Sequence, residues 1–188
     1  MTLGKSEPMQ RRAFSDHEIL VLGQSIEVSE DLISDHFKIS TSQWQRYRYD
    51  IQSLKDLAEV EITDLAFAQI RRYARCPSER LRGSEAVEYF KICLQDHIIV
   101  RALRRDRQIQ LLPLTTYIVT HELIHVVRFA RFLQRFEVSE RERESEECLV
   151  HRITRELLRP VKMPGLADVL TAFGEVGMME MMVTAGST

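Results

Sequence analysis

The sequence predicts an α+β protein that is predominantly helical, with a small antiparallel β-hairpin beside its longest helix. From Ser15 onward, apolar residues recur at helical intervals, usually behind a Ser, Thr or Asp that can cap a helix. Two runs interrupt this pattern, the β-branched residues 98–100 and the alternating residues 108–111. The 188 residues, 44% hydrophobic and 29% charged, have the size and composition of one globular domain.

We expect this domain to span residues 15–176. Its N-terminal part, residues 15–96, is predicted to be helical, and the functional motif described below lies in residues 97–160. Residues 1–14 and 177–188 show no regular pattern, so we expect both ends to be flexible.

Composition and charge exclude several kinds of partner. The net charge of −2 provides no global positive field for nucleic acid, and no apolar run reaches the roughly 18–20 residues that a membrane helix needs. The three cysteines form no CxxC pair, so any metal must use other ligands. The first residues lack the apolar core of a signal peptide. We therefore expect a cytoplasmic protein that contacts neither membrane nor nucleic acid.

The N-terminal elements are predicted from capping residues and helical spacing. Apolar residues such as Ile62, Ala66 and Ile70 repeat on one side of a helix. Ser84, followed by Glu85 and Glu88, resembles a helix start. The expected helices lie near residues 15–25, 28–37, 42–58, 62–75 and 84–95.

The remaining elements follow a change of pattern after residue 96. The two interrupting runs predict an antiparallel hairpin between Ile98 and Leu112, which Pro113 ends. Thr115 or Thr116 can cap a long helix that runs to about Phe136. Two further helices are expected, one from Ser139 to Leu158 and a short one that follows Gly165 and ends near residue 174.

Residues 121–125 of the long helix read HELIH, an HExxH motif. At roughly 100° per residue, His121 and His125 lie about 40° apart and can reach one metal ion. Glu122 lies about 100° from His121, where it can contact a water molecule on that ion as a general base. Apolar residues surround this helix, and buried histidines need a metal or hydrogen bonds to satisfy them.

A zinc site needs a third protein ligand and an open position for water. Positions 128 and 131 are arginine, which excludes the HExxHxxGxxH pattern, so the ligand must come from another helix. The acid-rich start of the next helix offers four candidates, Glu142, Glu144, Glu146 and Glu147, of which Glu144 projects away from the inward face. Periodicity alone favours Glu146, which projects near the centre of the inward face, whereas Glu147 projects near its edge.

The two helices together resemble the gluzincin metallopeptidases, in which a glutamate on a second helix follows HExxH. Counted from Glu147, residues 150–160 are similar to the ExxANxFAxxLLMP segment of the small soluble ImmA/IrrE peptidases and, more distantly, to the ExxAD segment of CAAX prenyl proteases. His151 stands where those families have Asp or Asn. The resemblance covers residues 109–160, and implies a zincin-like fold and one Zn²⁺ held by His121, His125 and Glu147.

Three residues near the motif have alternative roles. His151 is either a partner of a ligand histidine, a third ligand in place of glutamate, or a surface residue. Arg128 faces the metal side of its helix, where it pairs with an acid of the next helix or holds a substrate carboxylate. Gluzincins usually add a His or Tyr that stabilises the oxyanion, and Tyr117 is a candidate for that role.

These features predict a zinc metalloendopeptidase that hydrolyses peptide bonds of a protein or peptide substrate. Glu122 would take the proton of a zinc-bound water and deliver it to the leaving amine. The edge of the expected hairpin either aligns an extended substrate or only closes the core. The alternatives are a catalytically inactive zinc-binding regulator on the same scaffold and a helical interaction protein in which HExxH is accidental.

Overall fold

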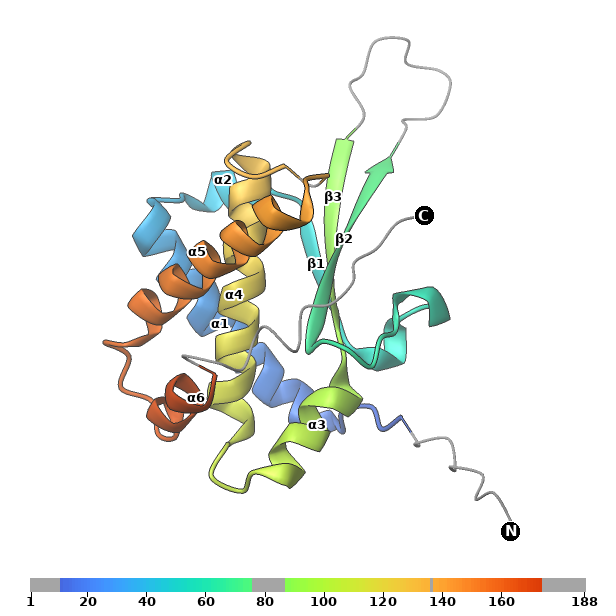
Figure 1. The fold of residues 1–188 in the computed structure, drawn as a ribbon, viewed down its shortest axis with the longest axis vertical. Helices are drawn as coiled ribbons and strands as arrows, with labels where there is room; N and C mark the ends of the chain where they lie inside the picture. Colours follow the sequence, from blue (N-terminus) through green and yellow to red (C-terminus); the bar gives the residue numbers. More distant parts are fainter. Residues whose placement is uncertain (1–10, 76–86, 136, 174–188) are drawn as a thin grey trace.

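The computed structural model describes residues 11–75, 87–135 and 137–173 (Figure 1). Helix α4 (Leu111–Ala130) runs through the middle, between a small sheet on one side and α5 (Glu140–Leu158) on the other. Helix α1 (Asp16–Phe37) packs along α4, and the short α6 (Leu166–Ala172) covers its N-terminal half. The prediction of a mainly helical α+β protein is confirmed. Among the described helices, none has an apolar stretch long enough to span a membrane.

Helix α1 is continuous where the sequence predicted two helices, 15–25 and 28–37. Its start is a capping box, in which Ser15 and Glu18 each satisfy a backbone amide of the other. The chain leaves the helix through Lys38, which has a left-handed conformation at φ 53°. Neither Gly nor Pro separates the two predicted segments at residues 26–27, so nothing breaks the helix there.

The predicted helices at 42–58, 62–75 and 84–95 are wrong, because each of these segments contains a strand of a three-stranded sheet. Only α2 (Thr41–Trp44) is helical near the first segment; β1 (Tyr49–Gln52) and two 3₁₀ turns, η1 (Leu54–Asp56) and η2 (Glu59–Glu61), follow it. The central strand β3 (Val87–Leu94) pairs parallel with β1 and antiparallel with β2 (Ala68–Arg75). The part of the chain expected to be all helical, residues 15–96, therefore contains the whole described sheet.

The predicted hairpin at 98–112 is also wrong. Residues 96–105 form α3 (Asp96–Arg105), whose β-branched residues 98–100 are all buried. Burial against the core outweighs their weak preference for strands. Helix α4 begins at Leu111, which places Pro113 in the first turn, where a missing backbone N–H costs nothing. An antiparallel pair does exist in the protein, but it is β2 with β3.

The C-terminal helices lie close to their predicted positions. Ser139 caps α5 in a second capping box, with Glu142. Gly165 precedes α6 at φ 78°, a conformation that favours glycine, and the side chain of Gln110 lies against it. Helix α4 ends at Ala130, earlier than the predicted residue 136, which lies outside the described residues.

The ends of the chain, expected to be flexible, lie largely outside the described residues. Phe14 is described and is buried, and its backbone N–H donates to Asp96 at 2.8 Å. The same carboxylate accepts from the backbone N–H of Leu54 at 3.0 Å. Asp96 thus ties the start of α1 and the turn after β1 to the start of α3.

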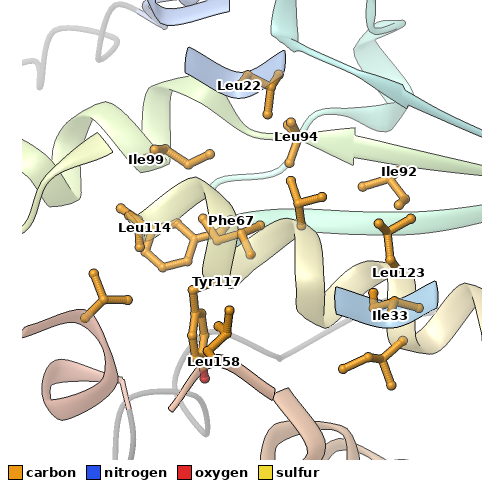
Figure 2. Close-up of a cluster of buried hydrophobic side chains, with 14 of the residues drawn as sticks. Leu22, Ile33, Phe67, Ile92, Leu94, Ile99, Leu114, Tyr117, Leu123 and Leu158 are labelled. Atoms are coloured by element: carbon orange, nitrogen blue, oxygen red, sulfur yellow. The ribbon is translucent and has the colours of Figure 1, made fainter. Parts of the chain in front are cut away.

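The hydrophobic core forms around α4. Leu114, Leu123 and Val127 of this helix have no exposed surface, and they pack with Ile33 of α1, Ile92 of β3 and Leu158 of α5 in one cluster (Figure 2). Removing a residue such as Leu123 from water contributes about 2 kcal/mol or more. Because these residues are completely buried, α4 can neither rotate about its axis nor slide along its neighbours. The direction in which its polar residues point is therefore fixed.

Candidate metal centre

The interface between α1 and α4 holds the helix of the HExxH motif in place. Small polar residues line it, so the two helices approach closely. Ser25 and Thr115 share a hydrogen bond of 2.5 Å, and Thr120 donates to Ser29 at 2.9 Å; all four side chains are buried. With this face turned to α1, His121 and His125 face α5. They are 3% and 5% exposed, as expected for histidines inside an apolar helix.

Helix α5 brings a carboxylate to the two histidines. The Nε2 atoms of His121 and His125 lie 3.2 Å apart, and Glu147 Oε2 lies 3.3 Å from the first and 3.2 Å from the second. Tetrahedral zinc with bonds of about 2.0–2.1 Å has neighbouring ligand atoms about 3.3–3.4 Å apart. The three atoms therefore match one face of a zinc coordination tetrahedron. Within the described residues, this trio is the group of His, Cys, Asp and Glu that could hold an ion.

The electrostatics of the trio favour a cation. Burial raises the pKa of Glu147, but the hydrogen bonds from His121 and His125 outweigh it, so the pKa lies well below its usual value. Burial lowers the pKa of His125, but the hydrogen bond and charge of Glu147 outweigh it and raise the pKa to about 9. Glu147 is therefore a carboxylate anion that faces the two imidazoles. A divalent cation bound there would release the proton of His125.

Glu122 lies next to His121 and is not a member of the trio. Its side chain is partly buried, and this burial raises its pKa above the usual range, although the nearby histidines oppose the shift. A carboxylate with a raised pKa beside a metal site is a better proton acceptor than an ordinary glutamate. Its environment is therefore compatible with a general base.

Glu146, which periodicity favoured as ligand, is engaged elsewhere. Arg128 Nη2 donates to Glu146 Oε2 at 2.8 Å and to Oε1 at 3.0 Å, and Arg128 Nε donates to Oε2 at 3.0 Å. This is a bidentate ion pair between α4 and α5, one of the two roles foreseen for Arg128. The two histidines lie beside the edge of the inward face of α5. Glu147, at that edge, therefore reaches them, whereas Glu146, at the centre of the face, meets Arg128 instead.

His151 and Tyr117 lie beside the trio without joining it. The Tyr117 hydroxyl and His151 Nδ1 share a hydrogen bond of 3.0 Å, and the His151 ring lies 4.7 Å from the ring of His121. Burial and the charge of His121 lower the pKa of His151 to about 3. This histidine therefore stays neutral and adds no charge to the site.

One residue of the site has no signal in the sequence. Gln134 lies beyond the end of α4, and its Oε1 accepts a hydrogen bond of 3.0 Å from His125 Nδ1. The predicted helix ran through this position, so Gln134 was expected to be one more helical residue. A polar residue nine positions after HExxH has no periodic relation to His125, and only the turn after α4 brings them together.

Comparison of the chain with protein families, with curated proteins and with solved structures finds no match.

Proposed function

We propose that the protein is a zinc-dependent metalloendopeptidase of the cytoplasm, with a zincin-like fold, that cleaves peptide bonds of a protein or peptide. The observation that carries the proposal is the convergence of His121, His125 and Glu147, whose ligand atoms lie 3.2–3.3 Å apart. When bound, zinc would supply Lewis acidity to a water molecule and to the substrate carbonyl. Two histidines and one carboxylate are the protein ligands of several hydrolytic zinc sites, and a further glutamate beside them serves as general base.

The residues of the chain would divide the remaining work. Glu122 would accept a proton from the attacking water and deliver it to the leaving amine, because a carboxylate with a raised pKa can both take and release that proton. The neutral pair of Tyr117 and His151 would keep the wall of the site beside His121 uncharged. Arg128 would hold the start of α5 against α4 through Glu146, and so keep Glu147 in reach.

The substitution Glu122→Gln tests this assignment. We expect zinc content to stay near one per chain and the rate of peptide cleavage to fall by about 10²–10⁴-fold, because only the proton acceptor is lost. Cleavage is followed by mass spectrometry of new termini in a broad synthetic peptide library. Wild-type protein that binds zinc but cleaves nothing in the library would contradict the enzyme, and would favour the zinc-binding regulator.

A further inference from the structure

The turn after α4 brings one side chain back onto a ligand of the proposed metal. Residues 128–133 form a Schellman motif, in which Phe132 N–H donates to the carbonyl of Phe129 at 3.0 Å and Leu133 N–H to that of Arg128 at 2.9 Å. The pivot is Phe132, at φ 55°, a conformation usually taken by glycine. The Phe132 side chain is 90% exposed, so packing of this ring does not explain the turn.

Arg131 anchors the same turn to the end of α1 and to the segment after α2. Its Nε donates to Tyr47 O–H at 2.9 Å, and its Nη2 donates to the carbonyl of Phe37 at 3.0 Å. The guanidinium also lies over the Phe37 ring, 5.7 Å from its centroid. The direction of the chain after α4 is thus fixed from both sides of Phe132.

The side chain delivered by this turn is Gln134. Its Oε1 can only accept, so His125 Nδ1 must donate the 3.0 Å hydrogen bond between them. In neutral imidazole, a proton on Nδ1 leaves the lone pair on Nε2, the atom that faces His121 and Glu147. By contrast, Nδ1 of His121 is buried without a hydrogen-bond partner among the described residues.

We propose that Gln134 is the positioning residue for the metal ligand His125, and that the turn around Phe132 serves to place it there. The Gln134 amide fixes both the orientation and the tautomer of the His125 ring, with Nε2 free to bind metal. This inference rests on the proposed function, because it assigns Gln134 to the metal site. Removing an outer partner of a metal-binding histidine typically lowers metal affinity 10–100-fold.

The test compares zinc affinities of Gln134→Leu, Gln134→Asn and Gln134→Glu, measured at pH 7 by competition with a chromophoric chelator. We expect a 10–100-fold loss for the Leu and Asn variants, since one removes the acceptor and the other is one methylene too short. The Glu variant should keep wild-type affinity or exceed it, because its carboxylate accepts the same bond more strongly. Leu133→Ala, in the same turn but with the side chain exposed, is the matched control.

A spectroscopic measurement separates positioning from a general effect on folding. In the Co²⁺-loaded Glu variant, the visible absorption bands should shift while far-ultraviolet circular dichroism stays unchanged, because a carboxylate makes His125 a stronger donor. Wild-type affinity in both the Leu and Asn variants would overturn the role of Gln134 and leave the metal site intact. Wild-type protein that binds neither Zn²⁺ nor Co²⁺ would overturn the proposed function as well.

Discussion

Glu146 and Glu147 are neighbours on α5, and their different partners follow from the face of α4 that each one meets. Arg128 is 11% exposed at its side chain and takes both oxygens of Glu146. The two histidines lie closer to the middle of α4 and meet Glu147. Arg128 therefore occupies the carboxylate that periodicity made the better candidate, and Glu147 lies beside the two histidines.

Separate alanine substitutions of the two glutamates test this division. We expect Glu147→Ala to lower the zinc content from about one per chain to a small fraction. Glu146→Ala should keep its zinc but lose about 1–3 kcal/mol of stability, because Arg128 is left partly buried and unpaired. Zinc is measured by mass spectrometry and stability by urea unfolding; Glu144→Ala, at an exposed position of the same helix, is the control. Loss of zinc in the Glu146 variant alone would reverse the assignment.

At the scale of elements, α4, α5 and α6 could be predicted, whereas the sheet could not. Capping residues such as Ser139 mark a helix start locally, and HExxH carries its own helical spacing. In β3, Phe90, Ile92 and Leu94 alternate along one face of the strand. This alternation is masked because Cys93, on the opposite face, is buried as well: the helical layer covers one face of β3 and η2 covers the other. A short strand with buried residues on both faces has no clear period that distinguishes it from a helix.

Residues 98–100 show the opposite error, because the sequence predicts a strand there and the structure has a helix. Ile98, Ile99 and Val100 are a strand-like run, but all three are buried in α3, and the core decides their structure. For the candidate metal site, spacing along α4 predicted that His121 and His125 lie on one face of the helix. The choice of Glu147 and the contribution of Gln134 depend on how three separate segments meet, which no local pattern records.

A buried ion pair joins η2 to the central strand of the sheet. Glu61 accepts from Lys91 Nζ at 2.7 and 2.9 Å and from Tyr73 O–H at 2.5 Å, and it is 3% exposed. Burial raises the pKa of Glu61, but the hydrogen bonds from Lys91 and Tyr73 outweigh it and lower the pKa to about 2. Because this pKa is below the unfolded value, the pair stabilises the protein above about pH 4.5 and loses this effect as the pH falls toward 2.

Glu61→Gln should therefore flatten the pH dependence of stability in acid. We expect the wild type to lose on the order of 2–3 kcal/mol more than the variant between pH 5 and pH 2.5, as measured by urea unfolding. Glu59→Gln, which changes an exposed glutamate of the same turn, should follow the wild type. Parallel curves for the wild type and Glu61→Gln would show that the pair does not govern acid stability.

At the scale of the whole molecule, the proposed metal joins two helices that the sequence separates. His121 and His125 come from α4, Glu147 comes from α5, and the turn that carries Gln134 connects them. The three ligand atoms converge only when α5 is docked on α4, so zinc should bind the folded chain far more tightly than the unfolded one. Any ligand with this preference stabilises the fold by mass action.

Removing the metal should accordingly lower the unfolding temperature. At free zinc 100 times its dissociation constant, binding stabilises the fold by about 2.7 kcal/mol. For a chain of this size, that free energy corresponds to about 5–10 °C, as measured by thermal unfolding with and without EDTA. The double variant His121→Ala, His125→Ala should show no difference between the two conditions, because it lacks two of the three ligands. An equal shift in this variant would place the stabilising zinc elsewhere, and would separate the stability of the fold from the HExxH helix.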